Sequence, residues 1–286
     1  MTISPATALL EIASFRSQAL NTLLDRSSDT SGSGTANDFA SILGAKSADQ
    51  VTAAASSDRN MSLRDPEAAF GMMTQINKLD VNFKAQFSEL SQLGDSVEKM
   101  EAVGGQLSDI DPTTDNSAIQ AQLQNFVAQY NTYVDRFTPD VQPGGVLDNV
   151  QAAEVSLYEL EQSVKNMFNG AKDGLNGMSD LGINIDSVTH RASLDVAKLD
   201  SVLASNKSGA VNAIDEFSAN FAKSADLLNS AGNFIPNSLD NRGRAIQYIT
   251  DHISSLQSEF GTGNSAQPTG AVAKALAAYE STFGIA

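Results

Sequence analysis

The sequence contains no cysteine and no tryptophan, and it has only two histidines in 286 residues. Without cysteine the protein has no disulfide bond, thiolate metal ligand or thiol nucleophile. The two histidines, His190 and His252, do not stand in the HExxH spacing of zinc peptidases, and no set of residues suggests a catalytic triad. We therefore expect a protein that is not an enzyme and has no catalytic residue, metal site or cofactor.

Basic residues are also scarce. Eighteen Lys and Arg stand against 34 Asp and Glu, which gives a formal net charge of −16. This balance disfavours nucleic acid and anionic membranes as partners, because both are bound largely through Lys and Arg. No run of residues approaches the roughly 20 apolar residues of a membrane-spanning helix, and no basic region followed by an apolar core begins the chain. We expect no nucleic-acid partner, no membrane insertion and no cleaved signal.

Apolar residues are present in a helical pattern. After Asp65 and Pro66, a helix start signal, apolar side chains recur at steps of three and four until Asp111 and Pro112 end the pattern. The stripe consists of Phe70, Met73, Ile76, Leu79, Phe83, Phe87, Leu90, Leu93, Val97, Met100, Val103 and Leu107. So long a stripe predicts a long helix that packs along a partner helix.

Further helices follow this first one. The pattern predicts a second helix from Ile119 to Phe137, a loop over residues 138–146 that includes Pro139, and a third helix from Leu147 to Phe168. Alternating residues at 182–185 and 192–194 predict a small β-hairpin with its turn near Ser187.

Two shorter helices are expected after the hairpin, a short one opened by Asp195 and carrying apolar residues up to Leu203, and a second over 211–228. A last long helix begins near Ser238, where apolar residues form a coiled-coil seam up to Phe260. Residues 271–283 form a short alanine-rich helix or a disordered end.

The apolar stripes at 66–110 and 238–260 are expected to pack against each other, because neither can stay exposed to water over its length. The sequence thus predicts a mainly α protein, an elongated antiparallel helical bundle or coiled coil with one small β-hairpin. We expect an N-terminal region over 1–62, with an amphipathic helix at 6–25 and a flexible linker, a bundle domain over 63–260, and a tail over 261–286.

Three groups of polar or aromatic residues are candidates for binding sites. Asp109, Asp111 and Asp115 resemble a calcium loop, but the glycine and the bidentate glutamate of that loop are missing, so a capped helix end is favoured. The aromatic residues around Tyr130 and Tyr133 are expected in the core. Arg242 and Arg244 bridge to carboxylates of a neighbouring helix or subunit, or mark a solvated helix end.

The order of these elements resembles the C-terminal region of the flagellar filament-cap protein family, hook-associated protein 2. The likeness covers about residues 117–260 and rests on three segments: MSDLGINIDSVTHRASLDVAKL at the hairpin, QNFVAQYNTYVDRF at the second helix, and GNFIPNSLDNRGRAIQYITDHISSLQ with Arg242. In that family a β-rich pair of domains separates the first two helices. Here the short segment DPTTDNS stands between them, so the chain resembles the helical region without those plate domains.

The resemblance implies a non-enzymatic structural or assembly protein that acts through helix contacts. It implies self-association, contact with flagellar axial proteins such as flagellin or hook-filament junction proteins, and an extracellular location on the bacterial flagellum after export without a cleaved signal. The alternative is an export or assembly adaptor that binds a partner through its N-terminal helix. The expected interaction seam consists of Phe83, Leu90, Val97, Phe126, Tyr130, Leu239, Ile246, Ile249, Ile253, Leu256 and Phe260.

Overall fold

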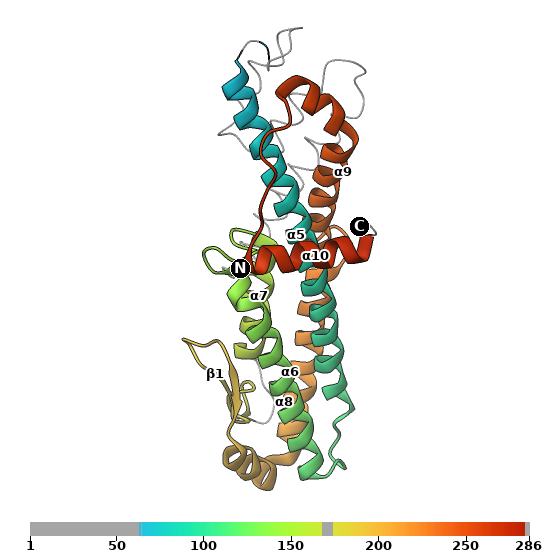
Figure 1. The fold of residues 1–286 in the computed structure, drawn as a ribbon. Helices are drawn as coiled ribbons and strands as arrows, with labels where there is room; N and C mark the ends of the chain where they lie inside the picture. Colours follow the sequence, from blue (N-terminus) through green and yellow to red (C-terminus); the bar gives the residue numbers. More distant parts are fainter. Residues whose placement is uncertain (1–62, 64, 168–173, 284–286) are drawn as a thin grey trace, which may run out of the picture. The chain divides into compact units, whose positions relative to one another are not determined.

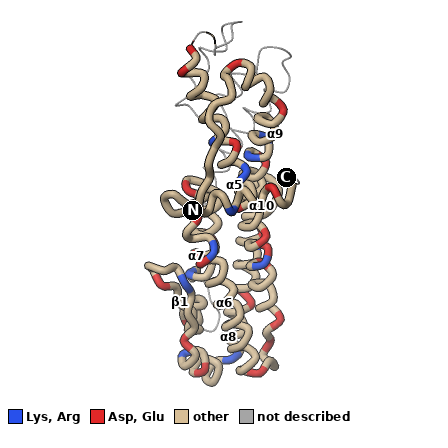
Figure 2. The backbone as a smooth tube through the Cα atoms, in the orientation of Figure 1, with Lys and Arg blue, Asp and Glu red and all other residues tan. Residues whose placement is uncertain are grey.

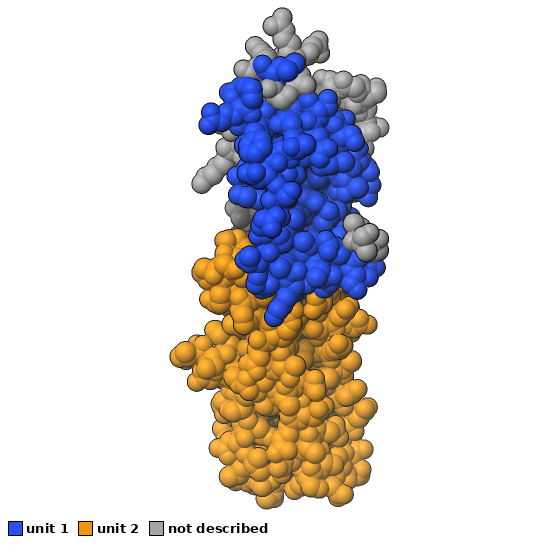
Figure 3. All heavy atoms as spheres, in the orientation of Figure 1, with its two compact units in different colours: residues 1–89, 237–286 blue, residues 90–236 orange. Residues whose placement is uncertain are grey.

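A computed structural model describes residue 63 and residues 65–167 and 174–283 of the chain. The expected amphipathic helix at 6–25 and the linker after it lie outside these residues. Two compact units are distinguished, unit 1 with residues 1–89 and 237–286, and unit 2 with residues 90–236 (Figure 3). The domain boundaries expected at residues 62 and 260 stay predictions.

The described chain is mainly α-helical with one antiparallel β-hairpin, as predicted (Figure 1). Its elements are α5 (Pro66–Gly105), the 3-10 helix η1 (Gln106–Asp109), α6 (Asn116–Val141), α7 (Gln151–Lys165), β1 (Ile183–Ile185), β2 (Ala192–Leu194), α8 (Val196–Asn229), α9 (Phe234–Phe260) and α10 (Gly270–Phe283).

The start of α5 follows its sequence signal. The Asp65 side chain accepts a hydrogen bond of 3.0 Å from the backbone N–H of Ala68, and Pro66 occupies the first helical position. The helix ends through η1 and a tight turn at Asp111, and α6 begins a few residues later. The first two long helices are therefore joined directly, as expected.

In unit 1, the first part of α5 packs against α9. Their shared core consists of Ala69, Met73, Ile76, Ile249, Leu256 and Phe260, with Met72, Phe83, Tyr248 and Ile253 packed against it. Asn77 of α5 donates hydrogen bonds to the backbone carbonyls of Thr262 and Asn264, just after the end of α9. Gln86, later in α5, accepts one from Arg242, early in α9. The two helices are therefore antiparallel, which confirms the predicted pairing of the early and late stripes.

Helix α10 also packs in unit 1. The ring of Phe87 on α5 meets the rings of Tyr279 and Phe283 edge to face, with centroid distances of 5.9 and 5.6 Å. Of the two alternatives for the end of the chain, a short helix or a disordered segment, residues 270–283 form the helix.

Unit 2 has an aromatic and aliphatic core between the later part of α5 and α6, α7 and α8. Phe126 of α6 contacts Phe217 and Phe221 of α8 edge to face, at 5.2 and 5.1 Å. A Cβ atom on Gly104 of α5 would lie 2.4 Å from the Phe221 ring, so only glycine allows this approach. The Ser218 hydroxyl donates a 2.8 Å hydrogen bond to the Gly104 carbonyl at the same place.

The predicted hairpin is confirmed. Ile183 pairs with Leu194, Asn184 with Ser193 and Ile185 with Ala192. Gly182, at a φ of 92°, turns the chain into β1, and a Cβ there would meet the Asp195 carbonyl. Asp195 then caps α8 through the N–H of Lys198.

Two helix boundaries were predicted wrongly around the α6–α7 connection. Helix α6 runs through Pro139 to Val141, because a proline in the last turn removes only one helical hydrogen bond. The ion pair of Arg136 with Asp140, 2.6 Å long, supports that turn. Helix α7 begins at Gln151 and not at Leu147, because Asn149 has a φ of 59° that a helix cannot contain.

Two more boundaries differ around α8 and α9. The two expected helices after the hairpin are separated by a single non-helical residue, Asn206, whose side chain caps the second segment through the N–H of Gly209. Helix α9 begins at Phe234, four residues before Ser238, because its first turn tolerates Pro236 and buries Phe234 and Ile235.

We predict that Ile249→Asp unfolds unit 1 at much lower denaturant concentration than the parent. Ile249 is buried in the α5–α9 core, so the substitution loses apolar burial and places a carboxylate without a counter-ion among aliphatic side chains. We expect a loss of about 4 kcal/mol or more in the free energy of unfolding, measured by urea denaturation.

Gln257→Asp, at an exposed position of the same helix, is the matched control and should change stability by less than about 0.5 kcal/mol. Equal stability of the two variants would mean that the apolar side of α9 faces water.

Candidate interaction surface

The residues of the expected interaction seam lie mostly inside the chain's own core. Eight are buried, namely Leu90, Val97, Phe126, Tyr130, Ile246, Ile249, Leu256 and Phe260, and three are half-buried, namely Phe83, Leu239 and Ile253. The structure brings Phe83, Ile249, Ile253, Leu256 and Phe260 together in unit 1, whereas Leu90, Val97, Phe126 and Tyr130 belong to unit 2. Their contact with other molecules stays a prediction.

The surface with the most specific polar contacts in unit 2 is where the hairpin lies against α6 and α7. Asn131 of α6 binds the outer edge of β2 with both ends of its side-chain amide. Its Nδ2 donates to the carbonyl of Ala192 at 2.9 Å, and its Oδ1 accepts from the N–H of Ala192 at 2.7 Å. The amide therefore replaces a neighbouring strand and satisfies backbone groups that the edge would leave unpaired.

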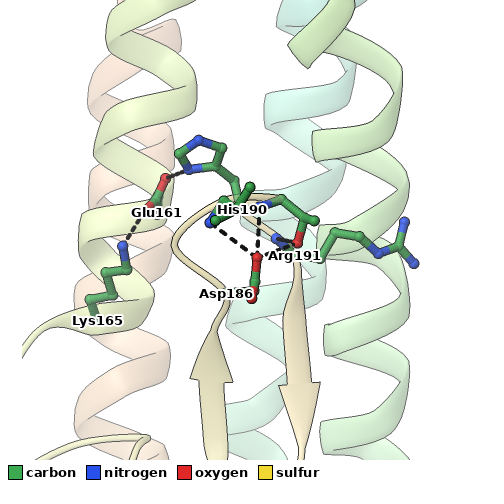
Figure 4. A network of polar contacts seen from close by, with 7 residues as sticks. Glu161, Lys165, Asp186, His190 and Arg191 are labelled. Atoms are coloured by element: carbon green, nitrogen blue, oxygen red, sulfur yellow. Dashed lines mark hydrogen bonds and ion pairs between the residues drawn. The ribbon is translucent and has the colours of Figure 1, made fainter.

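The hairpin turn is organised by Asp186 (Figure 4). Its carboxylate accepts hydrogen bonds from the N–H groups of Val188 and Thr189 at 3.0 and 2.7 Å, and from the Thr189 hydroxyl at 2.9 Å. The hydrogen bonds from Thr189 are the largest cause of the lowered pKa of Asp186. This turn holds His190 at a φ of 59° and leaves Val188 82% exposed.

The turn is tied to both helices by charged side chains. Glu161 of α7 forms an ion pair with Lys165 on the same helix and accepts a 2.8 Å contact from His190 Nδ1 (Figure 4). On the α6 side, Arg191 pairs with Asp135. An open groove of about 420 Å³ lies between α6 and the hairpin, lined by residues that include Asn131, Asp135 and Arg191.

The two histidines have structural contacts. His190 contacts Glu161, as described, and His252 Nδ1 lies 2.9 Å from the Tyr248 carbonyl while its ring stacks on the Tyr248 ring. Asp111 accepts hydrogen bonds from the backbone N–H groups of Thr113 and Thr114 and so holds the turn between the helices. Asp115, at the N-cap of α6, makes no side-chain capping hydrogen bond, so the expected capped helix end is not formed by that residue. Within the described ranges, no group of three or more His, Asp or Glu side chains could hold a metal ion.

Arg242 does not bridge to a carboxylate of a neighbouring helix. Its Nε donates to the Gln86 side chain at 2.9 Å and its Nη1 to the Ser238 hydroxyl at 2.6 Å, and burial lowers its pKa to about 10. The residue as a whole is half-buried. Arg244 instead forms an ion pair of 3.1 Å with Asp240 on its own helix. The sequence could not show that α5 would place an amide, not a carboxylate, opposite Arg242.

The fold and these contacts define a helical bundle protein whose hairpin is fastened to two of its helices. Residues 96–265 match the model of the family described as flagellar hook-associated protein 2 C-terminus, and the chain belongs to this family. The family is one of structural flagellar proteins. No curated protein and no solved structure matches the chain. In the part of the chain that the structure describes, no helix combines the length and hydrophobicity needed to cross a bilayer.

Sequence reasoning missed how the hairpin is held. Asn131 lies in one of the three segments that resemble the family, but nothing in its position shows that its amide would bind a strand 61 residues later. Polar residues on a helix face are usually solvated, and only the packing of β2 on α6 gives this one a partner.

We predict that Asn131→Ala destabilises unit 2 by about 1–3 kcal/mol, the cost of leaving buried backbone groups unsatisfied. Urea denaturation measures the loss, and faster hydrogen exchange at the Ala192 amide locates it. Gln129→Ala, at an exposed position of the same helix, is the control and should have little effect. If both variants had equal stability, the amide would not support the hairpin.

The pKa of Asp186 predicts an acid-dependent turn. Because its folded pKa lies below the ordinary aspartate value of 3.8, its contribution to stability is fully present above about pH 4 and is lost as the pH falls through the folded pKa. NMR titration should show the amide signals of Val188 and Thr189 changing together with a midpoint below 3.8. Asp186→Asn keeps an acceptor but cannot titrate, so this transition should disappear. A midpoint at or above 3.8 would contradict the prediction.

Proposed function

We propose that this protein is a non-enzymatic subunit of a flagellar cap-like structure, in which several copies associate and contact axial proteins such as flagellin or hook-filament junction proteins. The single observation that carries the proposal is the family match over residues 96–265. The order of elements supports it, since the long helices, the small hairpin and the late seam helix all fall within or next to the matched range.

Because the seam residues are mostly buried inside the chain, contacts with other copies must use other side chains. Because α5 and α9 bury their apolar sides against each other in unit 1, the helices form a stable scaffold within one chain. Contacts with other copies would then use side chains outside this core, where acidic residues occur along many of the helices (Figure 2). A partner or neighbouring copy would therefore present basic or apolar groups.

The location that fits this role is extracellular, on the flagellum. The composition supports this proposal in one respect, since a chain without cysteine cannot form wrong disulfides in an oxidising environment. The alternative role as an export adaptor depends on a helix at 6–25, which lies outside the described residues.

We predict that the purified full chain forms a defined multimer at micromolar concentration. Sedimentation velocity or light scattering over a hundredfold concentration range should give a mass that is a multiple of the 30.1 kDa chain. Deletion of residues 1–60 is the comparison variant, because an axial subunit would keep a folded bundle and lose only assembly contacts. A strict monomer at every concentration would contradict the cap role and favour the adaptor.

A further inference from the structure

A small cavity in unit 2 has no role in the fold described so far. It lies between α6 and α7 beside the hairpin turn and has a volume of about 210 Å³. Its lining consists of Tyr130, Val134, Thr138, Val141, Gln142, Glu154, Leu157, Tyr158, Glu161 and His190. Drug-sized ligands occupy cavities of roughly 300–1,000 Å³, so this one has room for a single amino-acid side chain.

The chemistry of the lining selects a cation on an apolar stem. Among the residues that the structure describes, Glu154 and Glu161 are the carboxyl groups that line the cavity, and neither Lys nor Arg is part of that lining. Glu161 is already bound to Lys165 and His190, but a carboxylate can accept more hydrogen bonds than these two. Between the acidic residues, Val134 and Leu157 provide aliphatic walls.

Tyr130 supplies a second, independent observation at this cavity. The residue is only 1% exposed, and its hydroxyl has no hydrogen-bond partner among the described residues. Burial first and the charge of Glu161 second raise the pKa of Tyr130, and both residues line the same cavity. A buried hydroxyl without a partner is costly, and an ammonium group next to it would donate the missing hydrogen bond.

We propose that this cavity binds the lysine side chain of a partner protein. The ammonium group would donate to the Tyr130 hydroxyl and to Glu161 and Glu154, while the four methylene groups would lie against Leu157 and Val134. Lysine fits better than arginine, because its compact ammonium needs less room than a planar guanidinium.

A protein is the favoured source of the ammonium group because exposed apolar side chains belong to the same two elements as part of the lining, α7 and the hairpin turn. Tyr158 lines the cavity and is 44% exposed, and Val188 stands two residues before His190 in the same turn. These side chains would pack against the residues next to the bound lysine, which a free amine does not have. The proposal uses only unit 2 and does not depend on the flagellar role.

The binding experiment uses the full chain and three probes: N-acetyl-lysine N-methylamide, the uncharged N-acetyl-norleucine N-methylamide, and n-butylammonium. NMR titration follows the signals of Leu157 and Tyr158. The lysine derivative should cause saturable shifts and bind more tightly than either of the other probes. Equal binding of the norleucine derivative would overturn the role of the carboxylates. Tighter binding of n-butylammonium would overturn the assignment to a protein side chain.

Three variants separate this site from general surface charge. Glu154→Gln should weaken binding of the lysine derivative about fivefold, whereas Glu159→Gln, on the same helix but outside the lining, should leave it unchanged. Tyr130→Phe should also weaken binding without lowering the melting temperature, because the lost hydroxyl has no partner in the free protein. Equal effects of the two glutamate variants, or unchanged binding by Tyr130→Phe, would overturn the proposal.

Discussion

The burial of the apolar side of α5 is the constraint on which the other helices depend. A helix of 40 residues with a continuous apolar stripe gains little stability alone, and each large aliphatic side chain left in water forgoes about 1.5–3 kcal/mol. In unit 1 that side is covered by α9, with Met73 and Ile76 next to Ile249 and Leu256. In unit 2 the later residues of the same stripe, such as Leu90 and Val97, are fully buried. The apolar stripe of α5 therefore contributes to the core of each unit.

Close packing adds specificity to this burial. Gly104 lets the ring of Phe221 approach the backbone of α5, and the Ser218 hydroxyl satisfies the carbonyl that faces it. Gly104 is therefore a packing residue. Its role is to bring two helices close together, at a position where any side chain would separate them.

The hairpin shows how a very short sheet is kept in place. Two strands of three residues cannot be stable alone. Asn131 pairs the free edge of β2, while Glu161 and Asp135 bind the residues at the turn from opposite sides. These contacts also shape the surface next to the cavity, since His190 is both a partner of Glu161 and part of the cavity lining. The polar network thus connects the stability of the hairpin with the surface available to a partner.

Sequence periodicity was enough to predict the helical class, the hairpin, and the pairing of the first and last long stripes, because each depends on local patterns. The family followed from the resemblance of three segments and the order in which they occur. The ends of the helices were harder to predict. The loop predicted around Pro139 ended α6 too early, and the left-handed conformation of Asn149, which delays the start of α7, is not visible in a hydrophobic pattern. Only the tertiary structure decided the partners of Asn131 and Arg242, and that the Tyr130 hydroxyl has none among the described residues. Whether a polar side chain has a partner depends on which distant segment of the chain packs against it. A single sequence does not show which segments pack together.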